Sequence, residues 1–258
     1  MKKLFSITVL LFFAKIIFCQ EDSISSKKYE NINWFSKDQI FENTNLWKKS
    51  IVPLGLMGIG LSLNKLETKI KLQNQFREPF NGFKTKADDF IQYAPVIELY
   101  TFDLCKFKAQ NSIWTQTKYL AISEVITTGI VLTLKYSLKI QRPENGSFNS
   151  FPSGHTAQAF VESQVLFNEF YQTNKLIAFS GFLTSISTGS LRVINNRHWI
   201  PDVLMGAGIG ILVTNLVYYF KPLKNWNPFL KYQHSKNHIS FSPNISPQFS
   251  GFNLRIGL

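Results

Sequence analysis

The sequence predicts an all-α protein, an antiparallel bundle of about six helices with its functional site at one end and a short C-terminal β-hairpin. Three observations predict this class. Apolar stretches of helical length recur through the middle of the chain, where strand-like alternation is scarce. Hydrophobic residues make up 45% of the chain, which excludes a disordered protein. Alternating apolar and polar residues occur only near the C-terminus, so a single hairpin is expected there.

Six segments carry the apolar pattern of helices. They are Ile51–Leu63, Ala87–Phe107, Gln116–Ile140, Gly154–Tyr171, Asn174–Val193 and Pro201–Phe220. Residues 64–86 are polar and basic, which indicates a connector in which an amphipathic helix can form. The last helix should stop before Pro222, and the hairpin is expected around residues 243–251.

The chain begins with the pattern of an export signal. Lys2 and Lys3 precede an apolar stretch over Leu4–Phe13, so residues 1–20 are interpreted as a signal peptide or, alternatively, as an uncleaved N-terminal anchor. The predicted organisation continues with an N-terminal helix and basic connector over 21–86. A helical catalytic domain follows over 87–220, and a tail with the hairpin occupies 221–258.

The charge balance points to an anionic partner. Lys and Arg number 28 against 16 Asp and Glu, which gives a formal net charge of +12. This sign suits phosphate esters, acidic lipid surfaces or nucleic acid. Because the sequence has no zinc-finger spacing, RNA-recognition signature or basic dimerising helix, nucleic acid is not expected as a partner.

The first cluster with chemical meaning lies at the end of the third predicted helix. Lys135 and Arg142 are seven residues apart, about two helical turns, which starts them from the same helix face. Pro143 disfavours helical geometry at Arg142 and should end the helix there. Two cations at a helix end suit a bound dianion, although a solvated basic helix end has the same pattern.

The second cluster begins the fourth predicted helix. Ser153 occupies the N-cap position, and the N–H groups of such a helix start bind phosphate oxygens. Gly154 permits close approach of the backbone to a ligand, and His155 lies in the first turn. An ordinary helix cap with a surface histidine is the alternative interpretation.

The third cluster joins the fifth and sixth predicted helices. It contains Arg192 and His198, and Pro201 fits the first turn of the last helix. Asp202 lies one turn from His198, so its carboxylate can accept the Nδ1–H and raise the basicity of Nε2. A histidine held in this way can act as a nucleophile or a base, although His198 could also be a boundary residue with satisfied hydrogen bonds.

Antiparallel packing brings the three clusters to the same end of the bundle. The first cluster ends one helix and the second begins the next, while the third ends one helix and begins another. Three cations, two histidines, a carboxylate and a helix N-terminus should therefore meet in one pocket. This combination predicts a phosphate site.

These segments resemble the signature of the type 2 phosphatidic acid phosphatase family, which also includes bacterial non-specific acid phosphatases and vanadium haloperoxidases. The three parts of that signature, K-x6-R-P, P-S-G-H and S-R-x5-H-x3-D, match Lys135–Pro143, Pro152–His155 and Arg192–Asp202 at every charged position. The resemblance covers roughly residues 87–220. One departure is Leu191, which stands in place of the Ser before the Arg.

The resemblance implies a phosphohydrolase that needs no metal or other cofactor. His198 would attack phosphorus to form a phosphohistidine and Asp202 would orient it, while His155 would protonate the leaving oxygen and then activate water. The phosphate oxygens would be held by Lys135, Arg142, Ser153, Gly154 and Arg192. Phosphoryl transfer agrees with such a site, because it needs positioning and charge neutralisation above all.

Several members of such a family remain as alternatives. The first is a membrane phosphatase of the cell envelope that hydrolyses a phosphatidate, a polyprenyl pyrophosphate or a lipid A phosphate at the periplasmic face of the inner membrane. The second is a soluble periplasmic acid phosphatase of broad specificity. A vanadium haloperoxidase and a non-catalytic phospholipid-binding protein are less favoured. If a cleaved signal precedes six spanning helices, the pocket faces inward. A periplasmic pocket then needs either an uncleaved first segment that acts as an extra span, with all other helices still crossing, or an early helix, Ile51–Leu63 or Ala87–Phe107, that lies flat, and we favour the non-spanning early helix.

Overall fold

A computed structural model describes residues 46–144, 146–223, 226, 239–246 and 249–256. The predicted signal peptide over 1–20 lies outside these residues. The described part contains eight α-helices, one 3-10 turn and two strands. They are α2 (Leu46–Ser62), α3 (Leu66–Arg77), η2 (Glu78–Phe80), α4 (Asp88–Ile91), α5 (Ala94–Leu104), α6 (Ile113–Leu138), α7 (Gly154–Phe170), α8 (Lys175–Ile194), α9 (Ile200–Phe220), β1 (Ile239–Ser246) and β2 (Phe249–Ile256).

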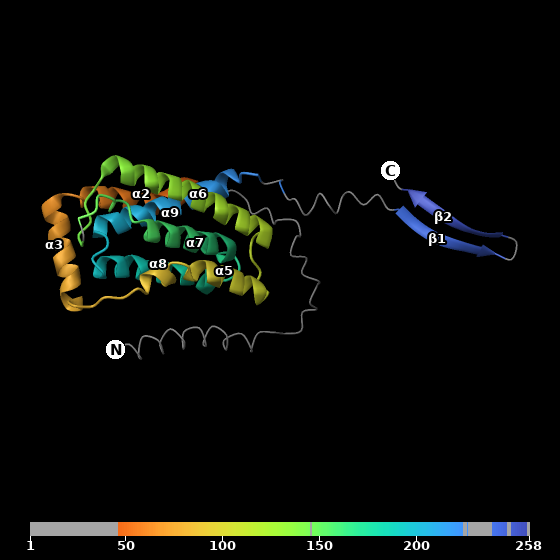
Figure 1. Ribbon diagram of the computed structural model, residues 1–258, viewed down its shortest axis with the longest axis horizontal. Coiled ribbons are helices and arrows are strands. Elements are labelled where there is room, and N and C mark those ends of the chain that lie inside the picture. Colours follow the sequence, from red (N-terminus) through yellow and green to blue (C-terminus); the bar gives the residue numbers. More distant parts are fainter. Residues whose placement is uncertain (1–45, 145, 224–225, 227–238, 247–248, 257–258) are drawn as a thin grey trace. The chain divides into compact units, whose positions relative to one another are not determined.

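Six helices, α2, α5, α6, α7, α8 and α9, run alongside one another in alternating directions, which confirms the predicted antiparallel bundle (Figure 1). Helix α7 is central and packs against α5, α6, α8 and α9, while α2 packs along α9. The α6–α7 and α8–α9 connections lie at the same end, and Figure 1 shows α3 lying across it. The three motif-bearing segments therefore share one end of the bundle.

The bundle has polar groups inside and apolar groups outside. Glu162 and Glu169 of α7 are buried, and they accept hydrogen bonds from the Val96 backbone N–H and from Asn111, respectively. Large apolar side chains instead face outward on every long helix except α7, and examples are Ile51, Ile97, Val125, Leu183 and Phe220. This distribution explains why α7 carries so many polar residues, since they face protein rather than the outer surface.

Three helices are long and apolar enough to cross a membrane, namely α6, α8 and α9. Helix α2 has 17 residues and α5 has 11. Among the described helices, neither of these two is long and apolar enough to cross a membrane, although both run along the bundle beside the longer helices (Figure 1). The expectation that one early helix lies flat in the membrane plane stays a prediction. Since α2 ends at the motif-bearing end, its first residue, Leu46, lies at the opposite end.

The prediction of a single helix over Ala87–Phe107 is wrong. The chain forms the short helix α4, turns at Gln92 and Tyr93, and then starts α5 at Ala94. Pro95 lies in the first turn of α5. A proline lacks the backbone N–H and its ring collides with the carbonyl four residues earlier, so a continuous helix through this position is disfavoured. The break lets α4 leave the axis of α5.

Close contacts between α9 and α7 fix the start of α7. A Cβ atom at Gly206 would lie 2.5 Å from the carbonyl oxygen of Ser153, and one at Gly210 would lie 2.4 Å from that of Ala157. Only glycine permits such approach of two helix backbones. The first turn of α7 is therefore positioned directly by the backbone of α9.

The C-terminal hairpin is confirmed as a secondary-structure element. Strands β1 and β2 pair antiparallel, with Ile239 opposite Ile256 and Ser246 opposite Phe249. Pro243 and Gly251 lie inside the paired strands, so the hairpin extends beyond the residues 243–251 around which it was predicted.

Candidate active site

The proposed nucleophile is held in the connection between α8 and α9. Nδ1 of His198 lies 3.2 Å from Oδ2 of Asp202, as the one-turn spacing predicts. The same oxygen accepts hydrogen bonds from the Trp199 backbone N–H at 3.0 Å and from the Ser150 hydroxyl. Because Nδ1 faces the carboxylate, Nε2 is the ring nitrogen left for chemistry. This is the arrangement that an activated histidine requires.

Burial decides the charge of His198. Its side chain is 1% exposed, and this desolvation lowers the pKa of His198 to about 4, against the opposing effect of Asp202. At neutral pH the imidazole is therefore uncharged, and its free nitrogen keeps the lone pair that an attack on phosphorus needs.

Two side chains of helix α3 contact the connection between α8 and α9. The Gln73 side-chain amide donates to the backbone carbonyls of Val193 and His198, at 3.2 and 3.4 Å. The ammonium group of Lys69 lies 5.0 Å from the centre of the Trp199 ring. The predicted amphipathic connector thus forms a helix that packs across the motif-bearing end of the bundle.

The first cluster reaches the site by a different route from the predicted one. Helix α6 ends at Leu138 and Lys139 is left-handed, so Arg142 lies in the loop and does not share a helix face with Lys135. The two cations meet at Asn149 instead. Lys135 donates to its backbone carbonyl at 2.6 Å, and Nε of Arg142 donates to its side-chain oxygen at 2.7 Å.

Ser153 stands at the N-cap of α7, as predicted, and is fully buried. Its hydroxyl, however, pairs with the Thr156 hydroxyl at 2.9 Å rather than with a backbone N–H of the first turn. At Gly154, an added Cβ would meet only Val131, at 3.8 Å. Protein packing alone therefore does not require glycine there, which is consistent with space kept for a ligand at the start of α7.

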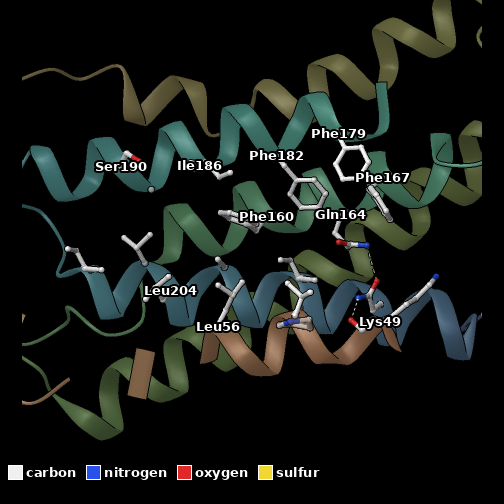
Figure 2. A pocket seen from close by; sticks show the side chains of 18 of the residues that line it. Lys49, Leu56, Phe160, Gln164, Phe167, Phe179, Phe182, Ile186, Ser190 and Leu204 are labelled. Carbon is white, nitrogen blue, oxygen red and sulfur yellow. Dashed lines mark hydrogen bonds between the residues drawn. The ribbon is translucent and has the colours of Figure 1, made fainter. Parts of the chain in front are cut away.

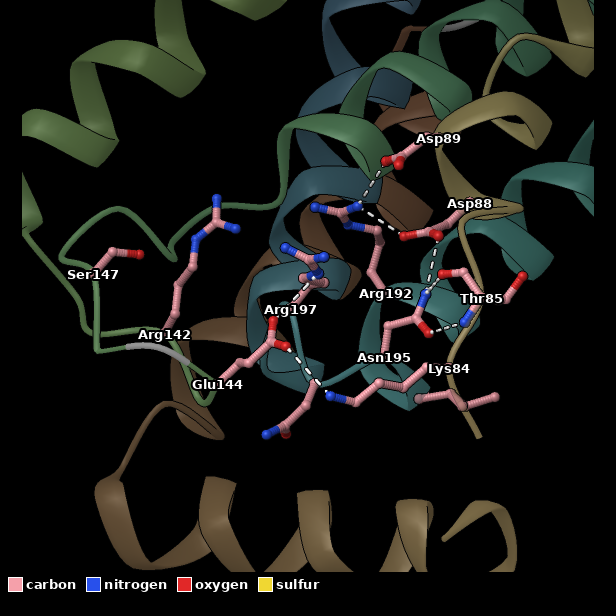
Figure 3. Close-up of polar contacts among 12 residues, drawn as sticks. Lys84, Thr85, Asp88, Asp89, Arg142, Glu144, Ser147, Arg192, Asn195 and Arg197 are labelled. Carbon is pink, nitrogen blue, oxygen red and sulfur yellow. Dashed lines mark hydrogen bonds and ion pairs between the residues drawn. The ribbon is translucent and has the colours of Figure 1, made fainter. Parts of the chain in front are cut away.

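Arg192 is the most constrained of the three cations. Its side chain is 7% exposed, and NH1 donates to Asp88 at 2.7 Å and to Asp89 at 3.3 Å (Figure 3). Asn195 donates to Asp88 at 2.9 Å and so helps to fix that carboxylate. The Nε group of Arg192 is buried and has no partner among the described residues, so it is available to an oxygen of a ligand.

His155 lies at the start of α7, where its Nε2 is 3.2 Å from Asp89. The structure thus brings all eight predicted site residues to one end of the bundle. Sequence reasoning missed four partners of these residues, which are Asp88, Asp89, Asn149 and Ser150. The adjacent Asp88 and Asp89 at the start of the predicted helix over Ala87–Phe107 were a visible signal, but nothing in the sequence showed which cation they would meet.

This geometry gathers three cations, two histidines and a helix start at one end of the bundle, and comparison with known proteins shows what the chain is similar to. The model of the PAP2 superfamily matches residues 132–226, which include all three signature segments.

One curated protein and two solved structures are similar to this chain. A Porphyromonas gingivalis protein described as lipid A 1-phosphatase is 34% identical over 143 residues, which are 55% of this chain and 32% of that protein. The chain thus spans about one third of that relative. Among solved structures, Aquifex aeolicus LpxE has a TM-score of 0.44 and 22% identity over 59% of this chain and 94% of its own. A PAP2-type phosphatidylglycerolphosphate phosphatase from Bacillus subtilis has a TM-score of 0.44 and 18% identity, over 69% of this chain and 98% of its own.

Proposed function

We propose that this protein is a metal-independent phosphatase that hydrolyses a phosphomonoester or pyrophosphate of a membrane lipid through a phosphohistidine. Three substrate classes fit: a phosphatidate, a polyprenyl pyrophosphate and a lipid A phosphate. The observation that carries the lipid part is an apolar groove beside the site. The similarity to a protein described as lipid A 1-phosphatase supports the same class.

The reaction follows from the placement of the two histidines. Nε2 of His198 attacks phosphorus as the bond to the leaving oxygen breaks, and protonated His155 donates its proton to that oxygen. Water then gives a proton to His155 and attacks the phosphohistidine, which releases phosphate and restores both imidazoles. Asp202 stays ionised and holds the ring of His198 throughout. Arg192, with its unpaired Nε, binds the phosphoryl oxygens.

The remaining groups bind the phosphate without changing protonation. Lys135 and Arg142 both donate to Asn149, and the Ser153 side chain and the Gly154 N–H lie at the start of α7, where the Ser153 N–H itself donates to the Asp202 carbonyl. A helix start attracts anions through its backbone N–H groups and dipole. Together with Arg192, these groups offset the charge on the transferring phosphoryl group.

The groove has a volume of about 820 Å³ and is lined mostly by apolar side chains of α2, α7, α8 and α9 (Figure 2). Val193 and Ile200 form one end and flank the connection that carries His198. Along α8 it extends from Val193 to Phe179, about 21 Å at the rise of an α-helix. Half of a bilayer's hydrocarbon core is about 15 Å thick. An acyl chain of one leaflet therefore fits beside a phosphate bound at the site.

The outer surface supports a membrane location rather than the soluble alternative. Exposed apolar side chains such as Ile51, Val125 and Leu183 surround an interior that holds buried polar and charged groups as well as apolar ones, which is an arrangement compatible with lipid. Helix α6 alone is about 39 Å long, more than the roughly 30 Å of a bilayer's hydrocarbon core. Trp114 and Trp199 lie at opposite ends of the bundle, where interfacial aromatic residues are expected.

We further propose that the site faces the periplasm. In that orientation Leu46 lies on the cytoplasmic side, because α2 starts at the end opposite the site. Two cysteine positions test this: Phe148, which is 63% exposed in the α6–α7 loop, and the native exposed Cys105 after α5, at the other end. In spheroplasts of strains that also carry Cys19→Ser, an impermeant maleimide should label Phe148→Cys in a Cys105→Ser background. Cys105 should react only after lysis, and the reverse pattern would contradict this orientation.

Phosphate release by the detergent-purified protein in EDTA tests the activity. The panel holds phosphatidate, polyprenyl pyrophosphate, a lipid A phosphate and a water-soluble aryl phosphate. We expect release from at least one lipid, unaffected by EDTA and reduced by orders of magnitude in His198→Ala. The matched control is His234→Ala, a histidine outside the signature, which should keep wild-type turnover. Equal efficiency on the soluble ester would favour the broad acid phosphatase, and near-wild-type turnover of His198→Ala would refute the mechanism.

Absence of release from every substrate would overturn the phosphatase proposal. Bromide oxidation with added vanadate would then test the haloperoxidase alternative, and vesicle binding would test a non-catalytic phospholipid-binding protein.

A further inference from the structure

The two neighbouring aspartates of α4 contact the site in different ways. Asp88 is buried and is fixed by Arg192 at 2.7 Å and by Asn195 at 2.9 Å. The side chain of Asp89 is 50% exposed and contacts two groups, Nε2 of His155 at 3.2 Å and NH1 of Arg192 at 3.3 Å. Arg192 is thus held by Asp88 even without Asp89, whereas Asp89 is the carboxylate in contact with His155.

The contact with Asp89 constrains the ring of His155. A carboxylate oxygen accepts a hydrogen bond only from a protonated Nε2. This fixes where one ring proton lies and leaves Nδ1 as the nitrogen that can transfer a proton to a leaving oxygen. The pairing has the same form as that of His198 with Asp202, except that there the carboxylate faces Nδ1.

The charged groups that act on His155 come from α4 and α8. Burial and the neighbouring Arg192 lower the pKa of His155, and Asp89 and Asp88 oppose this change. Lys135 of α6 and Asp202 of α9 act on His198 instead. Without Asp89, the charged form of His155 would therefore lose the closest carboxylate that stabilises it, while the neighbouring Arg192 would still destabilise it.

We propose that Asp89 is a positioning residue for leaving-group protonation, holding His155 in the charged form and orientation that donate a proton to the departing oxygen. This inference rests on the proposed phosphatase function. In the first step the bond from phosphorus to the leaving oxygen breaks as the bond from phosphorus to Nε2 of His198 forms. The proton of the His155 imidazolium moves to the leaving oxygen, and Asp89 remains ionised before and after.

The dependence on the leaving group distinguishes this role from a structural one. An alkyl phosphate has a poor leaving oxygen that needs a proton, whereas a nitrophenyl phosphate leaves as a stable anion. In Asp89→Asn we expect kcat on an alkyl phosphate to fall about tenfold to a hundredfold, at or below the lower limit of the roughly 10²–10⁴-fold typical of general acid catalysis, because His155 itself remains. On the nitrophenyl ester we expect a change below about threefold. Glu78→Gln, an exposed carboxylate of η2, is the matched control and should match wild type on both esters.

The pH profile gives a second readout. Because protonated His155 is the acid, activity falls as pH rises through its pKa in the enzyme–substrate complex. Removal of the Asp89 charge should move this alkaline limb of kcat to lower pH, by about one unit for an ion pair near the surface. Asp89→Glu should restore the limb at least in part. In a His155→Ala background, Asp89→Asn should cause no further loss, since both changes remove the same step.

An equal loss on both esters, or a rise in KM without a change in kcat, would overturn the proposal and assign Asp89 to phosphate binding through Arg192. An unshifted alkaline limb would also overturn it. The wild-type protein separates this result from the parent proposal, because its turnover of either ester establishes the phosphatase whatever Asp89 does.

Discussion

Asp202 offers a sharp test of the site, because one of its oxygens, Oδ2, accepts three hydrogen bonds. The donors are the Ser150 hydroxyl, Nδ1–H of His198 and the backbone N–H of Trp199. In Asp202→Asn these bonds lose their charge. A bond to a charged group contributes about 1.5–3 kcal/mol and a neutral one about 0.5–1.5. The three bonds together should therefore weaken by about 3 kcal/mol.

The other oxygen, Oδ1, adds to the cost. It is buried without a partner among the described residues, so the amide nitrogen of Asn at this place would bury N–H groups that have no acceptor. Such a group costs about 1–3 kcal/mol. The free energy of unfolding of Asp202→Asn should thus fall by about 4–6 kcal/mol, which thermal unfolding in detergent would show as a clear decrease in Tm.

The effect on turnover follows from the orientation of the new amide. The donors Ser150 and Trp199 face the Oδ2 position, so the amide oxygen rather than the amide nitrogen should occupy it. His198 then keeps its proton on Nδ1 and its lone pair on Nε2. Only the charge on its partner is lost, and turnover per folded molecule should fall about tenfold to a hundredfold.

Two results would refute this reasoning. Turnover of the folded fraction within about twofold of wild type would show that the carboxylate charge does not matter. A loss of about 10⁴-fold, the size seen when a catalytic histidine is held in the wrong tautomer, would show that Ser150 and Trp199 do not fix the amide. Ser150→Ala is the control, because it removes one donor but keeps the charge, and it should reduce turnover less than Asp202→Asn.

Three further predictions concern the surroundings of the site. Protonation of His198 removes the attacking lone pair, and burial lowers the pKa of His198 to about 4. The acidic limb of kcat/KM, corrected for substrate ionisation, should therefore lie near pH 4, and a limb near 6.5 would contradict the effect of burial. Gly206→Ala should lower kcat, and it should lower the free energy of unfolding by about 1–3 kcal/mol and hence Tm, because the new Cβ meets the Ser153 carbonyl. Gly129→Ala on α6 is the control, because an added Cβ there has no described neighbouring atom within 4 Å. This variant should keep the wild-type kcat and Tm, and equal behaviour of the two variants would contradict the contact at Gly206. Ser190→Phe, which narrows the groove, should raise KM for a diacyl phosphate and leave an aryl phosphate unchanged, and equal effects would argue against an acyl chain there.

The sequence was sufficient for the parts of the site that depend on local spacing. The pair of His198 and Asp202 needs only one helical turn between its members, and Ser153 needs only the start of a helix. The same reasoning failed for Lys135 and Arg142. It assumed that a helix continues to the residue before a proline, whereas α6 ends at Leu138 and the loop joins the two cations through Asn149.

Contacts between distant segments were beyond such reasoning. Asp88 and Asp89 meet Arg192 more than 100 residues away, which depends on how the chain turns between α4 and α5. The groove has the same origin, since residues of α2, α3, α7, α8 and α9 line it and no single helix shows it. Helix propensity and periodicity describe each helix separately, and neither contains the rotation of one helix against another.

Helix α9 connects the two halves of the proposed substrate site. One of its faces carries Gly206 and Gly210, whose contacts with α7 place the N–H groups that bind phosphate. Another face, with Leu204 and Ala207, lines the groove in which an acyl chain fits. Its first turn holds Asp202, which orients the nucleophile. A lipid bound along α9 would therefore present its phosphate at a fixed position relative to His198, so binding energy from the chain can act on the geometry of attack.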